Sequence, residues 1–385
     1  MVRRGGDVVS ALLGALVVVV WAVLLFGRDR WWRADERDDD VLPEPDAWPT
    51  VVAIVPARDE AAVIGRAVAS LAAQDYPGDF RVIVVDDGSV DGTGDVARAA
   101  GGARLNILTA TPLASGWTGK LAAVAQGIAA AGEPAFLWLT DADIAHAPTT
   151  LRRLVARAVA EDRVLVSHMA RLRTDSVAER ALAPAFVWFF MLLFPFAAVN
   201  RPGRVAAAAG GVMLVDAAAL ARAGGIAAIR GALIDDCALA KLFKTQGAIS
   251  LRLTRRSISL RPYRHVADIG AMIARSAYAQ LNYSPLRLVG TVAGLALTFL
   301  APPLLTVFAA GWPQAAGLAA WGAMSAAFQP SLRFYRRSPA WGAAVPAIAV
   351  VYGWYTVISA VQHARGRGGQ WKGRAQAPTN AAVAP

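Results

Sequence analysis

Cysteine and lysine are scarce in this sequence. The single cysteine, Cys237, excludes an internal disulfide and a zinc site built on cysteines, and it is compatible with a reducing compartment. Lysine occurs only at positions 120, 241, 244 and 372, so arginine supplies most of the positive charge. Few lysines beside many arginines and alanines are typical of a GC-rich bacterial source.

Charged residues are missing from three long stretches. No Asp, Glu, Lys or Arg occurs in the 19 residues 8–26, the 45 residues 288–332 or the 27 residues 338–364. Because about 20 apolar residues suffice for a helix to cross a bilayer, these stretches predict one, two and one membrane spans. Gly311-Trp312-Pro313 predicts the break between the two spans of the longest stretch.

The first stretch is interpreted as a retained anchor rather than a cleaved signal peptide. Its apolar core is long, and Arg28, Arg30 and Arg33 follow it in place of a small-residue cleavage pattern. The net charge of +11 is compatible with nucleic-acid binding or with contact to anionic lipid. Because the arginines flank the apolar stretches, we predict contact with a membrane and no nucleic-acid partner.

Strands and helices alternate over the next part of the chain. Strands are predicted at residues 50–55, 81–85, 104–108, 135–140 and 163–168, with helices at 59–74, 91–100, 119–131 and 149–160. This alternation predicts an α/β fold with a mainly parallel sheet. A strand at 212–215 and a helix at 235–246 follow. The aromatic segment 183–199 predicts either an interfacial helix or a buried core helix.

Two acidic pairs follow predicted strands, at the edge where such sheets bind ligands. Asp86 and Asp87 are expected to bind a ribose or a base, since adjacent acids repel unless a ligand uses them. Asp141 and Asp143, spaced by two, can point the same way and share Mg²⁺ or Mn²⁺. An ordinary turn is the alternative for both pairs, and for the neighbouring Asp91 it is the preferred interpretation.

Two further segments carry candidate functional groups. Gly116-Trp117-Thr118-Gly119-Lys120 precedes a predicted helix and either holds a phosphate or sugar hydroxyl or is a plain helix start with an exposed lysine. Asp235 and Asp236 follow an apolar run and open a helix. A carboxylate at this position acts either as the general base for an acceptor hydroxyl or as a helix cap.

Together these segments resemble a family 2 glycosyltransferase with the Rossmann-like GT-A fold. The matching residues are Pro56-Ala57-Arg58-Asp59-Glu60, Asp86-Asp87-Gly88-Ser89, Asp91-Gly92-Thr93, Gly119-Lys120, Asp141-Ala142-Asp143, Gly210-Gly211 and Asp235-Asp236. The resemblance implies that Glu60 and Asp86 or Asp87 bind the nucleoside. It also implies that Asp141 and Asp143 serve the metal and the diphosphate, and that Asp236 is the base.

The remaining assignments complete the predicted site. The nucleotide-sugar group also includes Pro56, Arg58 and Lys120, and Asp235 supports the base. Gly210, Gly211 and Arg275 are assigned to the acceptor or the diphosphate.

The branch is suggested by Trp117-Thr118-Gly119-Lys120, residues 275–281, Tyr283-Ser284-Pro285 and Trp371-Lys372-Gly373-Arg374, which resemble the hopene-associated membrane glycosyltransferases. The Q-x-x-R-W motif of processive synthases is missing, which favours the addition of one sugar. The predicted reaction moves a sugar from a UDP- or GDP-sugar to a hopanoid-type or other isoprenoid lipid, with inversion. A polyprenyl-phosphate glycosyltransferase and a non-catalytic membrane scaffold are the alternatives.

We therefore divide the chain into six parts. They are an anchor (1–27), a linker (28–47), the GT-A domain (48–260), an interfacial segment (261–285), C-terminal spans (286–364) and a basic tail (365–385) that is partly disordered. The predicted location is the bacterial plasma membrane, with the catalytic domain in the cytoplasm. Three C-terminal crossings would then put the basic tail outside, against the positive-inside tendency, unless one stretch is re-entrant.

Overall fold

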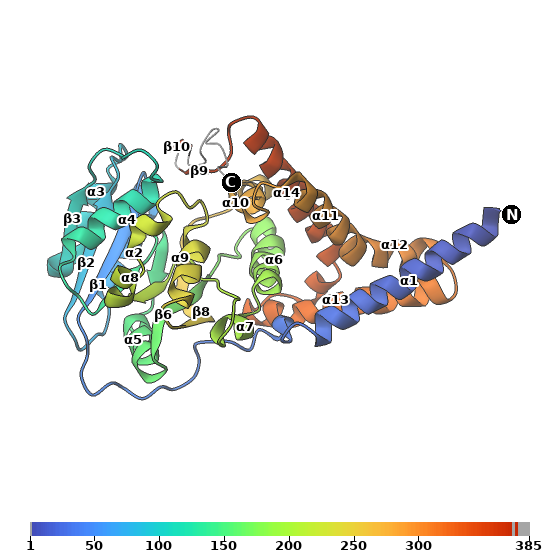
Figure 1. The fold of residues 1–385 in the computed structure, drawn as a ribbon, viewed down its shortest axis with the longest axis horizontal. Coiled ribbons are helices and arrows are strands. Elements are labelled where there is room, and N and C mark those ends of the chain that lie inside the picture. Colours follow the sequence, from blue (N-terminus) through green and yellow to red (C-terminus); the bar gives the residue numbers. More distant parts are fainter. Residues whose placement is uncertain (1, 372–373, 376–385) are drawn as a thin grey trace. The chain divides into compact units, whose positions relative to one another are not determined.

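The computed structural model describes residues 2–371 and 374–375, and these form two compact units (Figure 1). The helical unit comprises the described residues up to Asp35, Thr174–Pro195 and Tyr263–Gly368. The sheet unit comprises Glu36–Arg173, Phe196–Pro262 and the described residues from Gly369 onward. The segment 174–195, which lies inside the predicted GT-A range, therefore belongs to the helical unit.

The sheet unit is built on one sheet of eight strands in the order β3-β2-β1-β4-β7-β6-β8-β5. The strands are β1 (Val51–Ala57), β2 (Phe80–Asp86), β3 (Leu105–Thr109), β4 (Phe136–Leu139), β5 (Ile144–His146), β6 (Arg163–Arg171), β7 (Met213–Asp216) and β8 (Ala248–Ser259). The first four strands are parallel, β7 is antiparallel to β4 and β6, and β8 is parallel to β6. The predicted α/β fold with a mainly parallel sheet is confirmed.

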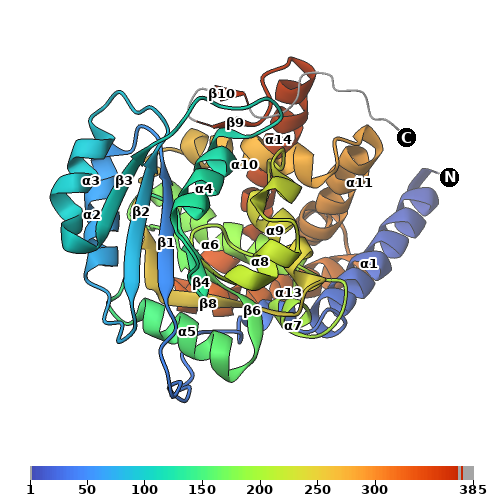
Figure 2. The same ribbon diagram turned by 60° about the vertical axis from the view of Figure 1, so that its left-hand side comes forward.

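Helices cover both faces of this sheet (Figure 2). They are α2 (Ala61–Ala72), α3 (Thr93–Gly101), α4 (Gly119–Ala130), α5 (Thr150–Ala160), α7 (Phe196–Asn200), α8 (Ala217–Arg222) and α9 (Asp235–Lys244). Side chains alternate along β1, so Ala53 and Val55 pack in one core with Val68 of α2. Ile54 points to the other face. There, a Cβ added to Gly127 of α4 would come within 2.6 Å of it.

Two strands of this sheet, β5 and β8, were not predicted. β8 contains Arg252, Arg255 and Arg256, which interrupt its apolar pattern. The strand is stabilised by pairing with β6 and by the segment before β1, which was predicted to be a plain linker. Asp38 N donates to the Leu253 carbonyl oxygen at 3.1 Å, and the buried Asp38 carboxylate pairs with Arg256 at 2.9 Å.

The helical unit contains the predicted apolar segments. Its helices are α1 (Val2–Phe26), α6 (Val177–Leu193), α10 (Val266–Gln280), α11 (Pro285–Leu295), α12 (Ala301–Phe308), α13 (Trp312–Phe334) and α14 (Val345–Ala364). A π-helical turn, Ala296–Leu300, joins α11 to α12. The chain breaks between Phe308 and Trp312, as predicted. Within the described residues, three helical stretches are long and apolar enough to span a membrane: Val8–Phe26, Pro285–Phe308 and Val345–Ala364.

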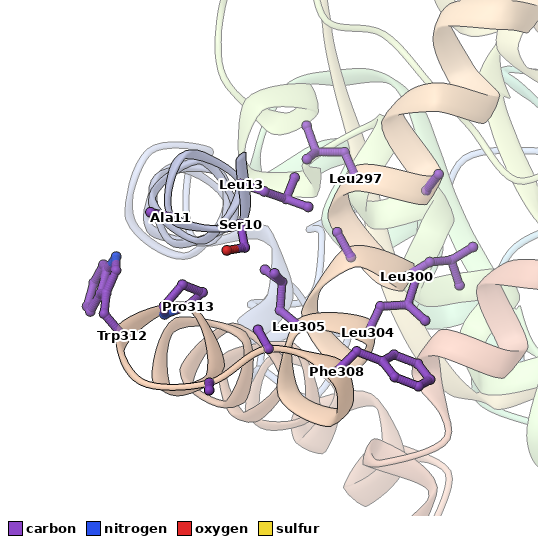
Figure 3. Close-up of a pocket in the computed structure, with 14 residues that line it drawn as sticks. Ser10, Ala11, Leu13, Leu297, Leu300, Leu304, Leu305, Phe308, Trp312 and Pro313 are labelled. Atoms are coloured by element: carbon purple, nitrogen blue, oxygen red, sulfur yellow. The ribbon is translucent and has the colours of Figure 1, made fainter. Parts of the chain in front are cut away.

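α6 carries the aromatic segment for which two interpretations were open. Trp188 is fully buried within the helical unit and donates to the Ala327 carbonyl oxygen at 3.1 Å, which favours the buried-helix interpretation. Elsewhere in this unit, α1, the π-helical turn, α12 and the start of α13 line a groove of about 1070 Å³. Figure 3 shows its mainly apolar lining, which includes Leu13, Leu304 and Phe308.

Candidate active site

The loop after β1 is fastened to the loop after β2. Glu60 N donates to Thr93 Oγ1 at 2.8 Å, and Asp59 N donates to Ser89 Oγ at 3.0 Å. The Asp91 carboxylate accepts from Ala61 N and from Thr93 N, both at 3.0 Å. The preferred interpretation of Asp91 as a turn residue is therefore confirmed, and the start of α2 is held by the same side chain.

Arg58 lies beside the first acidic pair. Its guanidinium donates to the Asp87 carbonyl oxygen and lies 3.8 Å from the Asp87 carboxylate. The Asp86 carboxylate accepts from Ser89 N at 2.9 Å. The protein itself thus supplies a cation to Asp87 and a backbone amide to Asp86, so the fact that the two acids are adjacent does not require a ligand.

Lys120 joins two of the predicted acidic segments. Its ammonium nitrogen lies 2.8 Å from Asp141 Oδ1, after β4, and 2.9 Å from Asp235 Oδ2, at the start of α9. Burial alone would lower the pKa of Lys120, but the two carboxylates raise it above its ordinary value. Thr118 caps α4 by accepting from Leu121 N, so the helix start holds the lysine at this position. The alternative of an exposed lysine is wrong.

Asp236 is held next to this ion-pair network. Its carboxylate accepts from Gly210 N at 3.1 Å and from Cys237 N at 2.7 Å, so backbone amides fix its orientation. Burial, together with the charge of Asp235, raises the pKa of Asp236 to about 6, although Lys120 opposes the shift. A half-buried carboxylate with this pKa is suited to take up a proton near neutral pH.

The paired glycines allow close packing at this point. A Cβ on Gly210 would lie 3.4 Å from the Lys120 ammonium and 3.5 Å from the Asp236 carboxylate, and a Cβ on Gly211 would press on Ile144 at 3.1 Å. Pro56, Lys120, Asp141, Gly210 and Asp235 line one small cavity of about 20 Å³. That volume suits a single water molecule, so a sugar enters only if side chains move.

Arg261 was not predicted as a site residue. It follows β8 in the sheet unit, and Nε donates to Asp143 Oδ2 at 2.8 Å while Nη2 donates to Glu60. Burial alone would lower its pKa, but the two carboxylates raise it. Because β8 was missed, residue 261 was taken as the start of an interfacial segment. Arg275 lies on α10 of the helical unit, and its role stays a prediction.

The residues present fit a divalent cation. Burial and the charge of Asp141 raise the pKa of Asp143, so a dication between these acids would relieve both unfavourable effects. Among the described residues, no group of three or more His, Cys, Asp or Glu side chains forms a metal cluster. Two carboxylates completed by water and substrate phosphates are a common set for Mg²⁺, so Asp141 and Asp143 suffice.

Residues 38–223 match the model of glycosyl transferase family 2. This part of the chain, somewhat under half of its length, is similar to family 2 glycosyltransferases. The match contains the acids after β1, β2 and β4, and it ends before α9 and β8. The protein is accordingly a glycosyltransferase, and its sheet unit has the GT-A fold. No curated protein sequence is significantly similar to the chain.

Solved structures of glycosyltransferases are similar to the chain. A mannosyltransferase from Pyrobaculum calidifontis, in complex with GDP-Man and Mn²⁺, has a TM-score of 0.54 at 21% identity and is matched over 92% of this chain and 99% of its own. Glucosyl-3-phosphoglycerate synthase from Mycobacterium tuberculosis, in complex with phosphoglyceric acid, has a TM-score of 0.40 at 23% identity, over 61% of this chain and 79% of its own. The first similarity supports the fold.

Proposed function

We propose that the protein transfers one sugar from a UDP- or GDP-sugar to a membrane lipid, with inversion at the anomeric carbon. The observation that carries this proposal is the environment of the Asp236 carboxylate. This carboxylate is oriented by two backbone amides, has a pKa of about 6 and lies at the edge of the Lys120–Asp141–Asp235 network. A single displacement needs one base of this kind on the acceptor side of the sugar.

In the proposed reaction, Asp236 takes the proton of the acceptor hydroxyl as its oxygen attacks the anomeric carbon. Lys120 is the cation whose charge offsets the negative charge that develops on the leaving nucleoside diphosphate. Asp141 and Asp143 would hold Mg²⁺ or Mn²⁺, which supplies further charge stabilisation when bound. Lys120 bridges Asp141 and Asp235 with two of its three N–H donors, so the third can be donated to a phosphate oxygen of the donor.

We assign the nucleoside to the loops after β1 and β2. Pro56 lies in β1 and Asp86 is the last residue of β2, whereas Arg58, Glu60 and Asp87 follow the ends of the two strands. Arg58 and Arg261 offset part of the negative charge of these loops. This offset matters because a nucleoside diphosphate is itself an anion and would be repelled by unpaired acids.

The proposed acceptor is a hopanoid-type or other isoprenoid lipid in the bacterial plasma membrane, with the sheet unit in the cytoplasm. This part of the proposal is supported by the three helical stretches that are long and apolar enough to span a membrane, because such stretches would hold the enzyme in a bilayer. A polyprenyl phosphate is the alternative acceptor, since it requires the same donor residues. The missing Q-x-x-R-W motif favours the transfer of a single sugar.

The test is transfer of labelled sugar from UDP- and GDP-sugars to extracted membrane lipids. We expect Asp236→Asn to abolish transfer and leave donor binding nearly unchanged, because the base contacts the acceptor. Asp95→Asn is the matched control, since Asp95 is an exposed acid on α3 that pairs with Arg98 of the same helix at 2.7 Å. Donor binding without transfer by the wild type would favour the scaffold alternative. Loss of donor binding in Asp236→Asn would contradict the base assignment.

A further inference from the structure

The apolar helices of the helical unit form a hairpin. α11, the π-helical turn and α12 follow one another along the chain, and α13 returns beside α12. Gln314 Nε2 donates to the Thr306 carbonyl oxygen at 3.1 Å near the turn, and a Cβ on Gly317 would meet the Pro302 carbonyl oxygen at 2.6 Å. The start of α11 and the end of α13 therefore lie at the same end of the hairpin, which we call the open end.

α1 runs parallel to α13 and ends near the open end as well. A Cβ on Gly14 of α1 would lie 3.2 Å from Pro313, at the start of α13. Trp31, just after α1, packs on Trp188 with ring centroids 5.0 Å apart, and Trp188 in turn donates to the Ala327 carbonyl oxygen. Position 327 lies in the second half of α13, so α1 and α13 both run toward the open end.

The chain does not leave this bundle after α13 but folds back along it. Three side chains at i, i+4 and i+8 on α13 donate to carbonyl groups of the segment 335–344. Trp321 Nε1 donates to Ala343 at 3.1 Å, Ser325 Oγ to Gly342 at 3.0 Å and Gln329 Nε2 to Pro339 at 3.1 Å. α14 thus begins beside Trp321, 13 residues before the end of α13, which is about 20 Å along the helix.

Gly342 is what allows this close approach. A Cβ there would come within 2.6 Å of Gln329 Nε2 and 3.0 Å of the Ser325 carbonyl oxygen. Non-helical backbone at membrane depth is tolerated only where protein satisfies its polar groups. The hydrogen bonds from α13 meet that condition for three carbonyl groups of the segment.

The other end of α14 returns to the open end. Ser359 Oγ accepts from Tyr278 N at 3.0 Å, and the His363 ring stacks on the Tyr283 ring with centroids 4.4 Å apart. Tyr283 stands two residues before Pro285, where α11 starts. α14 therefore runs from the middle of the hairpin to its open end and does not reach the turn at residues 309–311.

We propose that residues 335–364 form a re-entrant membrane segment, which enters the bilayer and leaves it on the same side. The chain then crosses three times, by α1, by α11–α12 and by α13. α13 is not among the three apolar stretches named above, but it has 23 residues, its one charged residue is Arg333 near its end, and it packs against α1 and α12. This inference rests on the proposed membrane location. It explains the exposed apolar face of α14, where Val350 and Trp354 are 50% and 61% exposed, because hydrocarbon covers that face.

The charges agree with this topology. Arginines near the open end are Arg28, Arg30, Arg33, Arg287, Arg333, Arg336, Arg337, Arg365 and Arg367. If α14 crossed the bilayer, Arg365 and Arg367 would be separated from the others. With α14 re-entrant, all of them lie on one side, as the positive-inside tendency requires, and Arg3 and Arg4 are the basic residues on the other side.

Single-cysteine labelling tests the proposal, because Cys237 is buried and its replacement by serine leaves a chain without cysteine. Ala310→Cys, Ala343→Cys and Arg367→Cys are then labelled with a membrane-impermeant maleimide in right-side-out and inverted vesicles; all three positions are exposed. We expect positions 310 and 367 to react from opposite sides. Position 343 should react only after detergent is added. Asp95→Cys in the sheet unit serves as the reference for the cytoplasmic side.

Two results would overturn the re-entrant segment. One is labelling of positions 310 and 367 from the same side, and the other is reaction of position 343 in intact vesicles. Recovery of the protein in the soluble fraction after a carbonate wash would overturn the membrane location itself, and with it this inference. Sugar transfer by the same variants, measured in detergent, reports separately on the proposed reaction.

Discussion

Replacing Lys120 by methionine removes the charge that joins Asp141 to Asp235 and keeps most of the side-chain volume. Lys120 Nζ lies 2.8 and 2.9 Å from the two carboxylates, and the side chain is 19% exposed. Removing one member of a buried ion pair costs about 3–5 kcal/mol, because the partner charges are left behind. Since solvent reaches part of this lysine, we expect the low end, about 3 kcal/mol, which corresponds to a fall of about 6–12 °C in melting temperature.

The same substitution shifts the pH dependence of transfer. The pKa of Asp236 is about 6 because burial and Asp235 raise it, while Lys120 holds it down. The base must be ionised to accept a proton, so kcat/KM should rise with pH through about this value and level off above it. Without Lys120 the pKa of Asp236 rises further, and the midpoint of the profile moves to higher pH.

The assays are thermal unfolding of the purified protein and initial rates of sugar transfer from acidic to neutral pH. Lys241→Met is the matched control, since Lys241 is exposed on α9, the helix that also carries Asp235. The double variant Lys120→Met/Asp235→Asn should lose less stability than the sum of its single variants, because one uncompensated charge is gone. A melting temperature and a pH midpoint unchanged from those of Lys241→Met would refute the reasoning.

Three further predictions follow from the site and the core. Arg261→Ala should tighten Mn²⁺ binding by about tenfold in calorimetry without donor, because a competing cation leaves Asp143; unchanged or weaker binding would contradict the ion pair's role. EDTA should abolish transfer by the wild type and Mn²⁺ or Mg²⁺ restore it, whereas Asp143→Asn should stay inactive at any metal concentration tested. Gly127→Ala should lower stability by about 1–3 kcal/mol in thermal unfolding, because its Cβ meets Ile54 at 2.6 Å, whereas Gly322→Ala, with open space around it, should not.

The parallel half of the sheet could be predicted because its signals are local. β1, β2 and β4 are short apolar runs, and helices with apolar periodicity separate β1, β2, β3 and β4. Parallel strands end at the same edge, so the acids after β1, β2 and β4 were expected to lie near one another. β5, at the edge of the sheet, and its neighbour β8 lacked such signals, because β5 has three residues and β8 contains arginines.

Because β8 was not predicted from the sequence, Arg261, the cation that follows this strand, was not predicted as a site residue. Leu260 N donates to the Asp143 carbonyl oxygen at 2.7 Å, which holds the next residue, Arg261, beside the metal pair. In the sequence, residues 143 and 261 are separated by more than a hundred positions. Only the pairing of β8 with β6 and β5 brings them together.

By itself, the sequence determined which segments are strands, helices and apolar stretches, and which acids end the parallel strands. These properties depend on the spacing of side chains over a few residues. The tertiary structure decided which charges meet: Lys120 between Asp141 and Asp235, and Arg261 between Asp143 and Glu60. It also decided the course of α14. The length and apolarity of that helix can be read from the sequence. Its direction depends on hydrogen bonds from α13 to residues 339–343, which no local sequence pattern predicts.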